Sequence, residues 1–255
     1  MPPSRADARA ASGKVMSFRY SVTIVASPRP RVGKTLLARL LTDFYIHEGR
    51  SVEAFDLNSG EGTLAQFMPE HATASGIADI QGQMALFDKL IADDDTTKVV
   101  DLGHESFESF FTLAKQIGFA EEARRRGIAP AILFVITPDR TSVEAYSRLR
   151  SRLPQAALTP VHNEILGPAQ HRDKYPTTGA GTAPVRLSAL APGLRRYIEK
   201  PPFSFSDARL ADAKGIPIEV HIELQRWLRK IYLEFRELDL RILLADLQSS
   251  IRLQS

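Results

Sequence analysis

The feature that most constrains this chain is an apolar, β-branched run at residues 23–26. It is followed by a short loop that ends in Gly33-Lys34-Thr35 and opens a leucine-rich helix. A phosphate-binding loop needs this order of strand, loop and helix, because the free N–H groups and the dipole of a helix N-terminus both favour an anion. In such loops the lysine reaches the β- and γ-phosphates, and the threonine hydroxyl binds Mg²⁺. The residues expected around the phosphates are Arg31, Val32, Gly33, Lys34, Thr35 and Leu36.

The loop departs from the glycine-rich pattern at three positions. Pro28 stands five residues before Gly33, where the full pattern has glycine, and Pro30 and Arg31 also occupy positions where many such loops keep glycine. Proline has no N–H to donate, so this loop offers a phosphate fewer backbone hydrogen bonds. The alternative is therefore a chance Gly-Lys-Thr at an ordinary helix start.

A second strand at residues 52–56 ends in a carboxylate, Asp56. In open α/β sheets, ligands bind outside the carboxyl ends of the strands. Asp56 is therefore expected to face the same site as Lys34. A turn or helix-cap aspartate is the alternative interpretation.

A third strand at residues 98–103 contains Asp101 near its end, two residues before Gly103. A carboxylate at this position can hold Mg²⁺ through water. The glycine would let the backbone turn toward a γ-phosphate. Three strand ends that supply Lys-Thr, Asp and Asp-x-Gly favour nucleotide binding over a chance tripeptide.

A fourth candidate is Asn163, near the end of a short strand expected at residues 159–164. A side-chain amide offers both a donor and an acceptor, so it can read the edge of a base. A turn asparagine is an equally good interpretation of the same position. The sequence leaves the two open.

Apolar runs alternate with helical patterns along the chain, which predicts an α/β fold with a mostly parallel, doubly wound sheet flanked by helices. We expect further strands at 18–26, 131–137 and 184–190, and helices at 35–47, 77–92, 107–126 and 143–153. From residue 218 to 251 the pattern is helical almost without a break. Acidic and basic residues balance along this long C-terminal helix, so we expect core packing plus a stripe that faces a partner, and not a membrane-surface helix.

The composition excludes several classes of chemistry. The 255 residues include no cysteine, which rules out disulfides, thiol catalysis and thiolate-ligated metals. The formal net charge is +3, which neither demands nor excludes an anionic partner. No apolar run reaches the roughly 20 residues of a membrane span, and no signal-peptide core is present, so we expect a cytoplasmic protein. We expect a disordered tail over 1–17, with Met16 as a possible true start, a nucleotide-binding domain over 18–215, and a helical extension over 216–255.

These motifs resemble those of the ParA/MinD family of P-loop ATPases. Residues 29–35, Arg-Pro-Arg-Val-Gly-Lys-Thr, are similar to the family's deviant Walker A loop, Lys-Gly-Gly-Val-Gly-Lys-Thr. Residues 56–60 resemble its Asp-x-Asp-Pro-x-Gly motif, and residues 101–103 resemble its third motif. The resemblance extends over about residues 18 to 200.

The resemblance implies roles for particular residues. Arg29 stands at the signature lysine, which reaches across an ATP-sandwiched dimer and acts with Lys34 in catalysis. Asp56 corresponds to the aspartate that positions water, and Asn163 to the adenine contact. The implied Mg²⁺ site consists of Thr35, Asp56 and Asp101, and Gly103 is counted with the nucleotide contacts.

The implied activity is that of a slow ATPase switch. ATP and Mg²⁺ favour a homodimer that positions or partitions DNA or a protein complex, as in plasmid stability or conjugal transfer, with DNA or a DNA-bound protein as partner. One alternative is a degenerate, non-hydrolysing nucleotide-binding scaffold, which the altered loop favours. Another is an ATP-dependent ligase of the dethiobiotin-synthetase type, whose loop also ends in Val-Gly-Lys-Thr.

Overall fold

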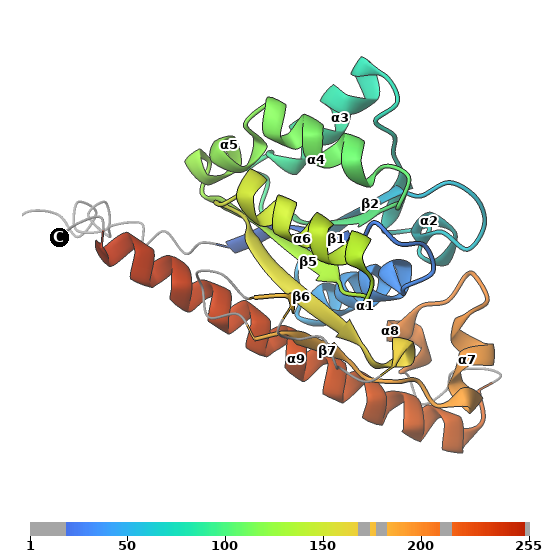
Figure 1. Cartoon of the computed structure of the whole chain (residues 1–255). Helices are drawn as coiled ribbons and strands as arrows, with labels where there is room; N and C mark the ends of the chain where they lie inside the picture. Colours follow the sequence, from blue (N-terminus) through green and yellow to red (C-terminus); the bar gives the residue numbers. More distant parts are fainter. Residues whose placement is uncertain (1–18, 168–173, 177–182, 210–215, 253–255) are drawn as a thin grey trace, which may run out of the picture.

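Seven parallel strands form the centre of the molecule (Figure 1), in the order β3-β2-β4-β1-β5-β6-β7. The computed structural model describes residues 19–167, 174–176, 183–209 and 216–252. The predicted tail over 1–17 lies outside the described residues.

The apolar content of each strand fits its place in the sheet. The three central strands are β4 (Thr97–Leu102), β1 (Arg19–Ala26) and β5 (Ile128–Val135). Every residue of β4 is buried, as expected for a strand covered on both faces of a parallel sheet. The outer strands are β2 (Val52–Leu57), β3 (Ala72–Ala74), β6 (Ala157–Asn163) and β7 (Val185–Leu187).

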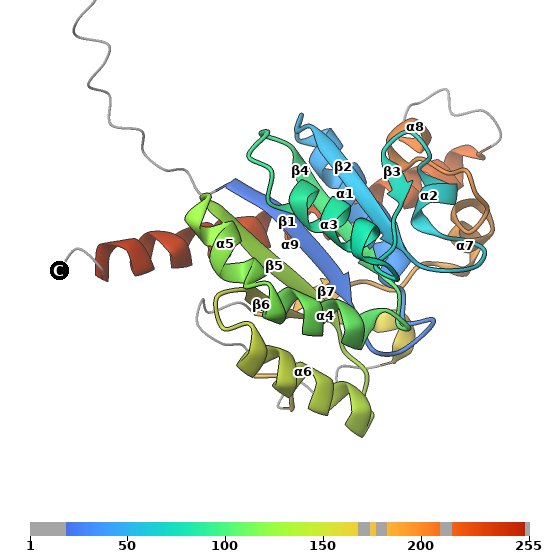
Figure 2. The ribbon, with the colours of Figure 1, turned by 90° about the horizontal axis from the view of Figure 1, so that it is seen from above.

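Helices cover both faces of the sheet, which confirms the predicted doubly wound α/β fold. Successive residues of β1 point to opposite faces, so Ile24 and Val25 belong to two separate cores. Figure 2 shows one face covered by α3 (Ile80–Leu90), α4 (Phe107–Gln116), α5 (Phe119–Arg125) and α6 (Arg140–Arg152). The opposite face carries α1 (Lys34–His47), α2 (Leu64–Phe67), α7 (Pro192–Ile198), α8 (Phe205–Ala208) and α9 (Ile218–Arg252).

The long C-terminal helix α9 packs in the same hydrophobic core as α1. Phe44 of α1 meets Tyr232 and Phe235 of α9 edge-to-face, with ring centroids 5.3 and 5.5 Å apart. Tyr232 donates a hydrogen bond to the buried Asp43, which ties the two helices together. No helix in the described ranges is long and apolar enough to cross a membrane.

Several elements differ from the predictions. The single helix expected over 107–126 is wrong, because Gly118 adopts a left-handed backbone with φ 63° and divides it into α4 and α5. The short helix α2 and the three-residue strand β3 were not predicted. The last strand is also shorter than the expected 184–190, since only Val185–Leu187 pair with β6.

Candidate functional site

The loop between β1 and α1 lies at the carboxyl edge of the sheet, where α1 begins at Lys34. Two of its residues have a left-handed backbone, Arg31 with φ 56° and Gly33 with φ 92°. At residue 33 glycine is required for space as well, since a Cβ there would lie 2.6 Å from the Asn163 side-chain nitrogen. At Arg31 the same backbone costs a non-glycine residue about 1 kcal/mol, so the loop keeps the shape of a glycine-rich loop with fewer glycines.

Lys34 is folded back over the loop. Its side chain is buried, and Nζ donates a hydrogen bond to the carbonyl oxygen of Arg29 at 2.7 Å. Burial lowers the pKa of Lys34, and the nearby Asp101 partly opposes that shift. A cation with one hydrogen bond to a neutral carbonyl is suited to exchange that contact for an anion.

Thr35 and Asp101 meet as the sequence predicts. The Thr35 hydroxyl donates to Asp101 Oδ2 at 2.7 Å. Asp101 is 0% exposed, and its other oxygen, Oδ1, has no hydrogen-bond partner among the described residues. Burial raises the pKa of Asp101 to about 7, the Thr35 hydrogen bond opposes this, and the neighbouring Asp56 adds to it.

Asp56 lies beside Asp101, because the two residues pair in the register of β2 and β4. Both of its carboxylate oxygens are already engaged. Oδ1 accepts from the backbone and the side-chain nitrogens of Asn58, each at 3.0 Å, and Oδ2 accepts from the Ala65 N–H at 2.8 Å. The turn role that the sequence left open is therefore present, and a role toward water or metal stays a prediction.

The Asn163 side chain ties the end of β6 to the loop between β1 and α1. Its amide nitrogen donates to the Val32 carbonyl at 2.9 Å, and its oxygen accepts from the Ile165 N–H at 3.1 Å. The residue is buried, and both its amide nitrogen and its amide oxygen are hydrogen-bonded to the protein backbone. Of the two interpretations of Asn163, the structure displays the turn, and an adenine contact stays a prediction.

Gly103 lies too close to the neighbouring backbone for a residue with a side chain. A Cβ at this position would lie 2.5 Å from the Leu57 carbonyl oxygen. The close approach lets the ends of β2 and β4 converge, and Asn58 donates across the gap to the Asp101 carbonyl at 3.2 Å.

Arg29 is held within its own chain. Its Nε and Nη2 donate to Asp139 Oδ1 at 2.9 and 2.6 Å, while 42% of the side chain remains exposed. Burial would raise the pKa of Asp139, but hydrogen bonds from Arg29, Thr137 and Ser142 outweigh it and hold that pKa at about 2. A contact from Arg29 to a second subunit would have to break this ion pair.

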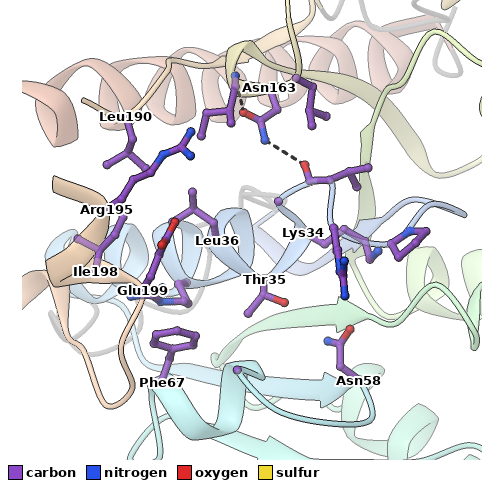
Figure 3. A pocket seen from close by; sticks show the side chains of 18 of the residues that line it. Lys34, Thr35, Leu36, Asn58, Phe67, Asn163, Leu190, Arg195, Ile198 and Glu199 are labelled. Atoms are coloured by element: carbon purple, nitrogen blue, oxygen red, sulfur yellow. Dashed lines mark hydrogen bonds between the residues drawn. The ribbon is translucent and has the colours of Figure 1, made fainter. Parts of the chain in front are cut away.

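A cavity of about 450 Å³ opens beside the phosphate loop. Figure 3 shows Lys34, Thr35 and Leu36 on one side of it, and Arg195, Ile198 and Glu199 from α7 and its end on the other. Asn163 and Leu190 line it from the ends of β6 and the segment after β7. The cavity therefore extends from the loop before α1 to α7, with both apolar and charged side chains in its lining.

Arg39 lines this cavity and was missed by sequence reasoning. It is 3% exposed, and its guanidinium carbon lies 3.6 Å from the centroid of the Phe67 ring. Neither Nε nor Nη2 has a hydrogen-bond partner among the described residues. Burial lowers the pKa of Arg39 to about 9, with Asp43 and Glu199 opposing the shift. The available signal was an arginine four residues after Thr35, on the leucine-rich face of the helix.

Together, the central β1, the loop that follows it and α1 form a strand–loop–helix unit at the carboxyl edge of a doubly wound parallel sheet, with an acidic residue at the end of the adjacent β4 beside it. No family model and no curated protein matches the sequence.

Solved structures with a similar course of the chain include two from Aquifex aeolicus. The MinC:MinD cell division protein complex has 13% identity and a TM-score of 0.47, covering 82% of this chain and 96% of that one. The MinD cell division protein has 13% identity and a TM-score of 0.46, covering 82% and 97%. A nucleotide-binding protein from Archaeoglobus fulgidus in complex with ADP has 15% identity and a TM-score of 0.35, covering 56% and 67%. Identities this low concern the fold alone.

Proposed function

We propose that this chain binds ATP with Mg²⁺ at the phosphate loop and acts as a nucleotide-dependent switch of the ParA/MinD type. The observation that carries the proposal is the pair formed by Thr35 and Asp101, next to the buried Lys34. A hydroxyl bound to a buried carboxylate with a free oxygen is unusual in a protein interior, where polar groups are normally satisfied. A metal ion at this place would satisfy that oxygen.

The residues present fit Mg²⁺ bound together with phosphates. The described residues contain no group of three or more His, Asp or Glu side chains that could hold a metal on their own. Mg²⁺ typically takes one or two protein ligands and completes its shell with water and substrate phosphates. Thr35 and Asp101 would hold the ion, which supplies charge neutralisation on the phosphates. Lys34 and the loop N–H groups from Arg31 onward would hold the phosphates themselves.

The proposed switch is a homodimer that ATP favours and that slow hydrolysis dissolves. In this proposal it positions or partitions DNA or a protein complex, with DNA or a DNA-bound protein as partner, for example in plasmid stability or conjugal transfer. Arg29 would complete the partner's site after leaving Asp139, since a guanidinium can bind a phosphate through two hydrogen bonds.

A non-hydrolysing scaffold is the second candidate, and a specific observation favours it. Asp56 already accepts three hydrogen bonds, from Asn58 and Ala65, which leaves its carboxylate little acceptor capacity to orient a water molecule. Measured ATP turnover separates the two candidates. The ligase alternative rests on the shared loop sequence alone.

Nucleotide should change the mass of the protein in solution. We expect a non-hydrolysable ATP analogue with Mg²⁺ to double the mass seen by sedimentation velocity, relative to ADP or no nucleotide, and Arg29→Ala to weaken that shift. Arg140→Ala is the matched control, because Arg140 is an exposed arginine of the adjacent α6. An identical mass in all three nucleotide states, together with tight ATP binding, contradicts the switch and supports the scaffold.

Replacing Arg39 should separate stability from binding. Arg39→Met keeps the packing volume and removes a buried charge whose Nε and Nη2 have no hydrogen-bond partner among the described residues, so we expect the free energy of unfolding to stay the same or rise by about 1 kcal/mol. The same change should weaken ATP binding about tenfold, because an anionic ligand loses a desolvated cation nearby. Chemical denaturation and calorimetric titration measure the two effects. Arg195→Met, at an exposed arginine of the same cavity, controls for stability. Destabilisation by Arg39→Met with unchanged affinity would show a purely structural arginine.

A further inference from the structure

Arg39 brings a buried cation to the cavity beside the loop that precedes α1. The residue is 3% exposed, and it lines that cavity. Its Nε and Nη2 are fully buried and have no hydrogen-bond partner among the described residues, which leaves Nη1 as the guanidinium nitrogen that can face the cavity. Buried polar groups are normally satisfied, so this guanidinium calls for a partner that the described chain does not supply.

Aromatic rings hold the guanidinium of Arg39 in place. Its carbon lies 3.6 Å from the centroid of the Phe67 ring, and 5.0 and 5.6 Å from the centroids of Phe205 and Phe203. Aromatic rings attract a cation to their faces, but they offer its N–H groups no carbonyl or carboxylate oxygen. The fold has therefore already removed this cation from water, and an anion in the cavity meets a positioned donor in a medium of low dielectric constant.

Two acidic residues lie near Arg39, and neither forms an ion pair with it in the described part of the chain. The carboxylate oxygens of Asp43 accept hydrogen bonds from Ser206 and Tyr232. Glu199, at the end of α7, lines the same cavity as Arg39, and its carboxylate has no hydrogen bond or ion pair among the described residues. Both negative charges raise the pKa of Arg39, against the larger lowering by burial. Glu199 is therefore close enough to be felt and too far away to pair.

The two charges belong to opposite walls of the cavity. Arg39 comes from α1, which forms one wall, whereas Glu199 lies on the other wall with Ile198 and Arg195 (Figure 3). Arg195 is exposed, and it adds a second cation to the lining at this end. A cation and an anion that face one cavity without meeting are complementary to a ligand that carries both signs.

We propose that the α7 end of this cavity binds a small zwitterion, namely an α-amino acid with an apolar side chain. The carboxylate of the ligand accepts a hydrogen bond from Arg39, and its ammonium group lies against Glu199. Such charge-assisted contacts are about twice as strong as neutral hydrogen bonds. Leu36, Phe67 and Ile198 also line the cavity, and they provide the apolar surface that the ligand side chain covers.

The charges of the cavity disfavour the simpler ligands. A carboxylate without an amine would place a second anion before Glu199, and an amine without a carboxylate would leave Arg39 unsatisfied. The triphosphate of ATP belongs at the N-terminus of α1, and Arg39 lies five residues beyond Lys34, about 7 Å further along the helix at 1.5 Å per residue. Arg39 therefore acts on the phosphates through its field and contacts the second ligand directly, and the proposal does not depend on nucleotide binding.

Calorimetric titration of the full chain without nucleotide tests the proposal. The ligands are L-valine, L-leucine, L-methionine and L-phenylalanine, and we expect one-to-one binding of at least one of them. Arg39→Met should weaken that binding about a hundredfold and Glu199→Gln about tenfold, because each removes a charge-assisted contact and Arg39 is the more buried of the two. Arg196→Met and Glu121→Gln are the matched controls, since both residues are exposed and neither lines the cavity. Circular dichroism verifies that all four variants are folded.

Ligand analogues test the two charges on the wild-type chain, so they remain decisive even if Arg39→Met does not fold. The amide of the bound amino acid lacks the carboxylate, and its N-acetyl form lacks the ammonium group. Each should bind at least about tenfold more weakly than the amino acid itself. The proposal is overturned if none of the four amino acids binds at millimolar concentration, or if either analogue or Arg39→Met binds as tightly as the original pair.

The same titrations separate this ligand from the nucleotide. Lys34→Ala should keep the affinity for the amino acid and lose the affinity for ATP with Mg²⁺. Amino-acid binding without any ATP binding by the wild type contradicts the proposed switch and leaves this inference supported. ATP binding without any amino-acid binding contradicts this inference and leaves the switch supported.

Discussion

Lys34→Ala is expected to weaken the binding of ATP with Mg²⁺ about a hundredfold, because a desolvated, charge-assisted hydrogen bond contributes about 1.5–3 kcal/mol. Lys34 is the lysine among the described residues that line the cavity. Among the residues that the structure describes, its Nζ has a single hydrogen bond, to the Arg29 carbonyl. Exchanging that contact for phosphate oxygens needs little rearrangement. Calorimetric titration of the two proteins measures the difference.

The loss of binding should not come from unfolding. Alanine removes a buried ammonium whose pKa is lowered by burial, so the folded chain loses one hydrogen bond and is relieved of a desolvated charge. We expect a change in unfolding free energy within about 1 kcal/mol. Lys115→Ala, at an exposed lysine of α4, controls for the overall charge. Equal affinity in Lys34→Ala and the wild type would contradict the phosphate-loop assignment.

The sequence predicted the part of the site that local patterns determine. β1, the loop and α1 follow from an apolar run that leads into Gly-Lys-Thr and a leucine-rich helix. Asp101 follows from a buried strand that ends in a carboxylate. Because parallel strands end at one edge of a sheet, these local signals also predicted that Thr35 and Asp101 would meet.

The remaining features depend on contacts between distant parts of the chain. The short strand β3 is the tripeptide Ala-Thr-Ala, which has no strand pattern and is positioned by its pairing with β2. Arg29 finds Asp139, which is 110 residues away, and Asn163 reaches Val32 across 131 residues. The guanidinium of Arg39 lies over aromatic rings from other parts of the chain. These are Phe67 of α2, Phe203 just before α8 and Phe205 within α8. No spacing in the sequence specifies such partners.

Asp101→Asn is expected to stabilise the ligand-free protein at pH 8 while removing its affinity for Mg²⁺ with nucleotide. The folded-state pKa of Asp101 is about 7, well above the ordinary value of 3.8. Between these values the folded chain binds more protons than the unfolded chain, so the free energy of unfolding falls as the pH rises. Asparagine stays neutral throughout and can still accept the Thr35 hydrogen bond.

The difference between Asp101→Asn and the wild type should therefore depend on pH. It should be near zero at pH 4, grow as the pH rises from about 4 to about 7, and level off at about 4 kcal/mol by pH 8, since the pKa shift is about three units and each unit corresponds to about 1.4 kcal/mol. Asp139→Asn supplies a control of opposite sign, because the pKa of Asp139 is lowered to about 2 and its stabilisation is present at pH 7 and lost in acid. Denaturant titrations at a series of pH values measure both variants. An Asp101→Asn difference that is equal at pH 4 and pH 8 would show that burial does not hold a proton on Asp101.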